Sequence, residues 1–175
     1  MKYFSYLLLL FIFSSCGAIQ VDYDYDRNAD FSSYTTYNYF ADMETGLSQL
    51  DEKRLLNAMD ITLQSKGLMF SEEADIFINI KSTVFRAQAG NSVGVGLGGG
   101  GRNVGGGVSI GIPVGGPKLN REIQVDLVDI KKDVLIWQAV SESPFKEGSS
   151  PLEKEQKMQE LVIKIFDKYP PKSSK

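Results

Sequence analysis

Cys16 is the only cysteine in the 175-residue chain, and its surroundings are typical of a cysteine that receives lipid. The chain starts with Met-Lys and continues with an almost wholly apolar run over residues 3–13, and small residues flank Cys16 on both sides. This is the layout of a bacterial export signal, and the run is short of the roughly 20 residues that a membrane-spanning helix needs. We therefore expect residues 1–15 to be a cleaved lipoprotein signal peptide, Cys16 to carry the lipid, and residues 16–20 to form a tether.

A lipid on Cys16 would place the protein on a membrane of the cell envelope. Two or more acyl chains make a stable anchor, whereas a single chain binds only marginally. Gly17 follows the cysteine, in place of the Asp that is associated with retention in the inner membrane of many Gram-negative bacteria. This favours the outer membrane of a Gram-negative bacterium. The alternative is an ordinary secretory signal that happens to contain a cysteine.

The composition removes the commonest catalytic groups. The chain has no histidine and no thiol besides Cys16, which excludes a Ser-His-Asp triad, a Cys-His pair and a histidine-bearing metal site. The 22 acidic and 19 basic residues give a net charge of −3 and a pI near 5.1. That balance argues against binding nucleic acid or anionic lipid through a basic patch. We expect no enzymatic activity, no cofactor and no metal.

Two residue patterns resemble ligand sites, and both are incomplete. Asp22, Asp24 and Asp26 are spaced like the first ligands of a calcium loop, but Arg27 stands where that loop needs glycine. Their alternation with tyrosine favours a strand with a solvated carboxylate face. Residues 94–99 match the dinucleotide fingerprint formally, yet a glycine-rich tract does so by chance and no helix opens after this one. We predict neither a calcium site nor a nucleotide site.

We predict strands where apolar and polar residues alternate with a period of two and where β-branched and aromatic residues are frequent. The patterns predict strands over residues 19–26, 34–40 and 76–85, and a hairpin of residues 120–130 with 134–141. Ile76, Ile78 and Ile80 would share one face of their strand. Trp137 lies on the second arm of the hairpin.

Two helices follow from capping residues and helical spacing. Ser48 opens a helix over residues 49–66, and Gly67 stands where a C-terminal cap glycine belongs. Ser150-Pro151, with Glu at residue 153, opens a second helix whose apolar stripe continues to residue 169. The predicted fold class is α+β: an antiparallel sheet with two amphipathic helices packed on one face. Residues 21–171 would form this single domain, and residues 172–175 a tail.

Residues 90–116 differ from the rest of the chain, since they hold 13 of its 17 glycines. Branched apolar residues alternate with glycine or serine in both halves of this insertion. We leave two structures open: a surface loop, or a long β-hairpin whose apolar face contacts a partner. The candidate contact residues are Val93, Val95, Leu97, Val108, Ile110 and Ile112.

The order of several short segments resembles one bacterial family. Apart from Cys16, these are residues 21–24, 31–37, 66–67, 74–76, 136–137 and 169–171. The chain is similar over nearly its whole mature length to the bacterial lipoprotein family called domain of unknown function 4136. The resemblance implies an envelope lipoprotein with an α+β domain, and it implies no catalytic residues.

We therefore expect a membrane-anchored envelope lipoprotein whose domain is a non-catalytic binding or scaffolding module. Its partners would be the membrane, through the lipid on Cys16, and an envelope protein, but not nucleic acid. The alternative is a periplasmic carrier of lipid or of a hydrophobic small ligand, held in a cavity between sheet and helices.

Overall fold

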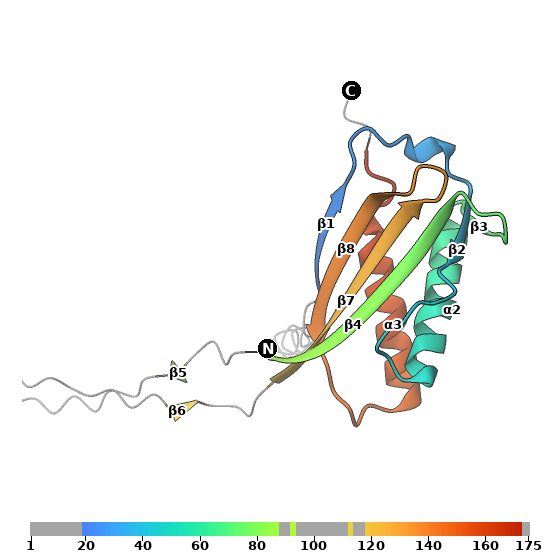
Figure 1. Ribbon diagram of the computed structural model, residues 1–175. Coiled ribbons are helices and arrows are strands. Elements are labelled where there is room, and N and C mark those ends of the chain that lie inside the picture. Colours follow the sequence, from blue (N-terminus) through green and yellow to red (C-terminus); the bar gives the residue numbers. More distant parts are fainter. Residues whose placement is uncertain (1–18, 88–91, 94–111, 114–117, 173–175) are drawn as a thin grey trace, which may run out of the picture.

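The computed structural model describes residues 19–87, 92–93, 112–113 and 118–172. Residues 19–87 and 118–172 form one six-stranded sheet with two long helices on one of its faces (Figure 1). The strands of this sheet are β1 (Gln20–Tyr25), β2 (Thr36–Tyr39), β3 (Met69–Phe70), β4 (Ile76–Ala87), β7 (Lys118–Asp129) and β8 (Val134–Pro144). The helices are α2 (Gln49–Ser65) and α3 (Pro151–Ile165), with short 3-10 helices η1 (Phe31–Ser33) and η2 (Phe166–Lys168). A separate two-stranded pair joins β5 (Ser92–Val93) and β6 (Ile112–Pro113).

The six strands lie in the order β1-β8-β7-β4-β2-β3. The neighbours β1-β8, β8-β7 and β7-β4 are antiparallel. In contrast, β2 pairs parallel with both β4 and β3. The predicted α+β class is confirmed, and the sheet is mixed where a wholly antiparallel one was expected. The reason is the path of the chain: α2 carries it back along the sheet after β2, so β3 and β4 run in the same direction as β2.

Both helices start where the capping residues predict. The Ser48 hydroxyl accepts a hydrogen bond from the Asp51 amide, and the Ser150 hydroxyl accepts one from the Glu153 amide. In α3 the Glu153 carboxylate also accepts from the Ser150 amide, which completes a capping box. Gly67 follows α2 with a φ of +88°, the left-handed conformation in which glycine is favoured.

The core fills the space between the sheet and the two helices. Ile76, Ile78 and Ile80 from β4 are fully buried, as are Ile123, Val125 and Leu127 from β7. From the helix side the buried side chains include Leu55, Met59, Leu63, Leu161, Val162 and Ile165. Each fully buried aliphatic side chain stabilises the fold by about 1.5–3 kcal/mol before the entropy cost is counted.

Trp137 lies inside this core. It is fully buried and stacks on Phe166, with ring centroids 5.4 Å apart and the planes 12° from parallel. Tyr169 packs edge-on against Trp137 at 5.6 Å. Trp137 therefore has a packing role and offers no exposed aromatic platform.

The sheet has two distinct ends, which we call the anchor end, after the lipid expected on Cys16, and the turn end. The anchor end holds Gln20, where β1 begins next to Glu142 of β8, and the ends of β4 and β7 that flank the glycine-rich insertion. The turn end holds the β7–β8 turn, and the described chain finishes near it (Figure 1). Within the described residues, neither helix is long and apolar enough to cross a membrane.

Candidate functional site

The residues predicted to contact lipid or a partner lie largely outside the described part of the chain. Cys16 lies outside it, and so do Val95, Leu97, Val108 and Ile110. Val93 and Ile112 are described, and they are antiparallel partners in the β5–β6 pair. An antiparallel pairing at this position agrees with a hairpin at the base of the insertion.

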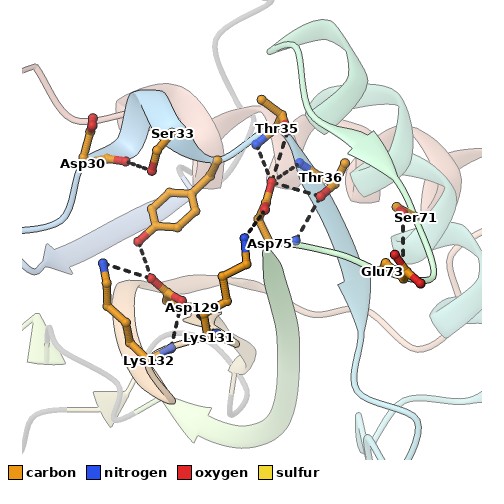
Figure 2. A network of polar contacts seen from close by, with 11 residues as sticks. Asp30, Ser33, Thr35, Thr36, Ser71, Glu73, Asp75, Asp129, Lys131 and Lys132 are labelled. Atoms are coloured by element: carbon orange, nitrogen blue, oxygen red, sulfur yellow. Dashed lines mark hydrogen bonds and ion pairs between the residues drawn. The ribbon is translucent and has the colours of Figure 1, made fainter.

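The densest polar cluster is at the turn end, where β2 and β4 begin (Figure 2). Asp75 Oδ2 accepts hydrogen bonds from the Thr35 amide at 3.0 Å, the Thr36 amide at 3.2 Å and both threonine hydroxyls at 3.1 and 3.0 Å. Its other oxygen lies 3.3 Å from Lys131 Nζ. Figure 2 shows these donors arranged around the Asp75 carboxylate. The Thr35 amide first, then the threonine hydroxyls and Lys131, hold the pKa of Asp75 far below its usual range.

Asp129, at the end of β7, is bound in a similar way. Its Oδ2 accepts from the Tyr34 hydroxyl at 2.8 Å and lies 3.2 Å from Lys132 Nζ, and its Oδ1 accepts from the Lys131 and Lys132 amides at 2.9 and 3.1 Å. Burial alone would raise the pKa of Asp129, but these hydrogen bonds, led by that of Tyr34, lower it. Burial and the neighbouring Asp129 raise the pKa of Tyr34 to about 12.

This cluster fits a structural role better than acid–base chemistry. A carboxylate with a lowered pKa is a poor general base, and a tyrosine with a raised pKa stays protonated at neutral pH. Each carboxylate also ties together segments far apart in sequence: Asp75 joins β4 to residues 35–36, and Asp129 joins the β7–β8 turn to Tyr34. We interpret the cluster as a clamp that fixes the turn end of the sheet.

Asp60 forms a second tyrosine–carboxylate contact. Its Oδ1 accepts from the hydroxyls of Tyr37 at 2.7 Å and Tyr39 at 2.8 Å. Burial, followed by the hydrogen bond to Asp60, raises the pKa of both tyrosines. Both hydroxyls therefore stay protonated at neutral pH, and the contact links α2 to β2.

The three aspartates of the incomplete calcium pattern lie on β1 and directly after it. Asp22 and Asp24 are exposed on β1, and Asp26 Oδ1 accepts from the Asn28 amide at 2.8 Å. Among the described residues no group of three or more acidic or cysteine side chains converges in a way that could hold a metal ion.

In the part of the chain that the structure describes, no helix covers the face of the sheet that points away from α2 and α3 (Figure 1). Asn79, Gln124, Asp126 and Gln138 lie on it, and Asp126 accepts from the Gln124 amide group at 3.0 Å and from that of Gln138 at 2.7 Å. Beside them a hollow of about 610 Å³ is lined by apolar side chains, among them Phe40, Met43, Val128 and Leu135, together with several charged ones. Leu135 is 49% exposed. We call this face, with its hollow, the open face.

A third charged cluster lies at the anchor end, and the sequence patterns did not reveal it. Asp51, at the start of α2, contacts Arg54 at 2.8 Å and Arg121 of β7 at 3.6 Å. The Arg121 guanidinium carbon lies 3.9 Å from the centre of the Phe145 ring. The sequence does contain a pattern that could have predicted this contact. Arg121 falls on the same face of its strand as Ile123, and Asp51 precedes Leu55 by one helical turn, so both charged residues share a face with core residues. A charge in phase with core residues predicts a buried partner.

A family model described as "Domain of unknown function (DUF4136)" matches residues 21–171. The chain belongs to this family. The resemblance predicted from the short segments is thereby confirmed at the level of the family. No curated protein matches the sequence of this DUF4136 member.

Solved structures share the fold of this DUF4136 domain at low sequence identity. A PDZ domain protein from Parabacteroides distasonis aligns with a TM-score of 0.55 at 13% identity, over 99% of this chain and 41% of that chain. The chain thus spans less than half the length of that protein. The PelC dodecamer from Paraburkholderia phytofirmans aligns with a TM-score of 0.50 at 9% identity, over 85% of this chain and 95% of that chain. At these identities the likeness shows a common fold alone.

Proposed function

We propose that this DUF4136 protein is a non-catalytic binding module of the bacterial envelope, anchored in the outer membrane by a lipid on Cys16. It would present the open face of its sheet to an envelope protein. One observation carries this proposal: α2 and α3 cover the same face of the sheet, and no described helix or strand covers the other face, which holds the hollow of about 610 Å³. Apolar side chains with a rim of polar and charged ones are the arrangement found at surfaces that contact a partner.

A lipid on Cys16 would also fix the orientation of the domain. Cys16 precedes Ile19 by three residues, and a fully extended chain spans at most about 3.6 Å per residue. Ile19, which is already buried in the domain, would therefore lie within about 11 Å of the lipidated residue. The anchor end would face the membrane, and the strands of the open face would point away from it.

The glycine-rich insertion remains a second proposed contact. It leaves the sheet at the anchor end, between Ala87 and Lys118, which are direct partners in the β4–β7 pairing. Its candidate residues Val93, Val95, Leu97, Val108, Ile110 and Ile112 would then contact a partner or lipid close to the membrane.

The space between sheet and helices gives no support to the alternative of a lipid carrier. Side chains with no exposed area fill it from both sides, including Leu55, Met59, Ile78, Leu127 and Trp137. A bound lipid would have to displace close-packed groups of this kind, which is costly. We therefore place binding on the surface of the domain.

Photocrosslinking in intact cells tests the proposed binding face. A photoreactive residue at Leu135 of the open face should give a discrete protein adduct, and one at Leu97 tests the insertion. Ile61, which is 56% exposed on α2, is a matched control site on the helix side. Adducts that form equally at Leu135 and Ile61, or at neither, would contradict an open-face contact.

The anchor is tested separately by Cys16→Ser. This variant should lose acyl incorporation and leave the outer-membrane fraction, because the thioether cannot form. Retention of the label in the variant would refute lipidation at Cys16.

A further inference from the structure

A cavity of about 210 Å³ lies at the anchor end, where β7 begins, β8 ends and α3 starts. That volume has room for several water molecules or for a small polar group with a few attached carbons. Its apolar wall comes from Pro144, Phe145 and Met158. Its cationic side chains are Arg121, Lys146, Lys154 and Lys157.

The charges around this cavity do not balance. The Asp51 side chain is only 7% exposed, and it serves both Arg54 and Arg121, so two guanidinium groups share one carboxylate. Arg121 is the more weakly paired of the two, at 3.6 Å, with a side chain that is 12% exposed. Its Nε is buried and has no hydrogen-bond partner among the described residues. A desolvated cation that is only partly neutralised favours an anionic ligand beside it.

The other acidic side chain at the cavity belongs to Glu153. Glu153 Oε2 accepts from the Ser150 amide at 2.7 Å as part of the α3 capping box. Lys146 is exposed and Lys154 half-buried at the cavity, and neither has an ion pair among the described residues. Four cationic side chains and two carboxylates line the cavity, and Arg54 and Glu160, which pair with lining residues from outside it, carry opposite charges. The cavity therefore carries an excess of positive charge, although the whole chain is acidic. The net charge of −3 averages over the molecule and does not describe this end of it.

The position of the cavity favours a lipid headgroup as the source of the anion. Arg121 pairs with Ser143 of β8, next to the Gln20↔Glu142 pair at which β1 begins. β7 lies two strands from β1, a lateral distance of about 10 Å at the usual strand spacing. The proposed tether places Ile19 within about 11 Å of a lipidated Cys16. The cavity and the anchor would thus meet the same membrane surface.

We propose that this cavity binds the phosphate headgroup of an anionic lipid in the membrane that holds the anchor. The phosphate oxygens would accept hydrogen bonds from Lys146, Lys154 and the Arg121 guanidinium, and the glycerol carbons would contact Phe145 and Met158. Basic side chains at a membrane surface bind anionic headgroups in this way. The inference rests on the proposed lipid anchor, which brings the cavity to the membrane.

The test uses the processed lipoprotein in nanodiscs of phosphatidylcholine that contain a minority of phosphatidylglycerol. A photoreactive residue at Ser149, which lines the cavity, reports the adjacent lipid by mass spectrometry. We expect phosphatidylglycerol adducts to exceed their share of the lipid about fivefold, the effect of roughly one favourable contact between a basic side chain and the headgroup. Adducts that simply follow the lipid composition would overturn the proposal.

Charge-reversal variants connect the effect to the cavity. The pair Lys146→Glu and Lys154→Glu should abolish the enrichment, while Lys164→Glu with Lys168→Glu, towards the other end of α3, should preserve it. Arg121 is left intact because its removal would disturb the Asp51 pairing. Enrichment that survives the Lys146 and Lys154 changes would refute the assignment.

Two further arms separate the remaining outcomes. Binding of soluble glycerol 3-phosphate without enrichment of phosphatidylglycerol would assign the cavity to a free phosphate and reject the lipid. A chain that fails to enter nanodiscs would count against the anchor on Cys16. If that chain sediments with phosphatidylglycerol vesicles but not with phosphatidylcholine vesicles, the result would still support headgroup binding in the cavity. No sedimentation with either would overturn the proposal of headgroup binding.

Discussion

Gly46 lies in the connection between β2 and α2 with a φ of +70°, and the backbone of β4 approaches it closely. A Cβ added there would lie 2.7 Å from the carbonyl oxygen of Ser82. The same connection is held by a hydrogen bond from the Ser82 amide to the Thr45 carbonyl at 2.8 Å. A side chain at residue 46 would therefore disturb both the conformation of the loop and its attachment to the sheet.

Gly46→Ala should lower the free energy of unfolding by more than about 2 kcal/mol, since the left-handed conformation costs about 1–2 kcal/mol and the contact with Ser82 adds to it. Gly67→Ala is the matched control, because Gly67 has a φ of +88° but no atom within 4 Å of an added Cβ. It should cost about 1 kcal/mol. Urea unfolding measures both, and equal losses would show that the close approach of Ser82 is unimportant.

Asp75 should make stability depend on pH. Its pKa is lower in the folded protein than the unfolded value of about 3.9, so its contribution is fully present above about pH 4 and is lost as the pH falls further. Asp75→Asn should cost about 2 kcal/mol at pH 7 and flatten the dependence below pH 4. Asp167→Asn, at a side chain that is 66% exposed and paired with the exposed Lys168, should cost far less at pH 7. Thermal unfolding between pH 2 and pH 7 measures the difference.

At the scale of the elements, the sequence predicted those helices and strands whose formation depends on residues that are neighbours in the chain. The starts of α2 and α3 and the β7–β8 hairpin follow from neighbouring residues, and the structure confirms them. β3 has two residues, too few for any period to be detected. The parallel pairing of β2 with β4 depends on the path of the chain through α2, which no local pattern encodes.

The same reasoning explains why the candidate sites were only partly predicted. Asp51 and Arg121 are 70 positions apart, and only the finished sheet brings them together. Asp75 and Asp129 resemble ordinary strand-end carboxylates in sequence. Their partners, residues 34–36, lie on a segment that joins the sheet through the long-range pairing of β2.

Deleting residues 91–116 tests the insertion as an element. The deletion leaves residues 88–90 and 117 between Ala87 and Lys118, a four-residue connection of a kind found in hairpins. The domain should stay folded and membrane-bound, and its unfolding free energy should rise by at most about 2 kcal/mol, because each halving of a loop saves about 0.6 kcal/mol. Circular dichroism and fractionation measure this. An unfolded product would show that the insertion is part of the core.

At the scale of the whole molecule, the two ends of the sheet should lie at different heights above the membrane. β7 has 12 residues, and at about 3.4 Å per residue it is about 40 Å long. The cavity with Arg121 is at one end of this length. The Asp75–Asp129 clamp and the end of the described chain are at the other.

Fluorophores at two exposed or half-exposed positions should report this difference in height. In the anchored protein, a label at Ser149 should be quenched by nitroxide carried on the lipid headgroups, and a label at Lys172 should not be, because quenching needs contact. Equal quenching at both positions would mean that the domain lies flat on the membrane. No quenching at Ser149 would show that the anchor end does not contact the membrane surface.

The pairing of β1 with β8 has a mechanical consequence. β1 is the first strand after the proposed tether, and its six residues run antiparallel to β8 from Gln20↔Glu142 to Tyr25↔Trp137. A partner held on the open face while the lipid stays in the membrane would pull β1 along its own axis. The hydrogen bonds of an antiparallel pair are perpendicular to the strands, so this tension would load all of them in shear at once rather than open them one by one. A short strand at the edge of the sheet can then transmit force between a membrane and whatever the domain holds.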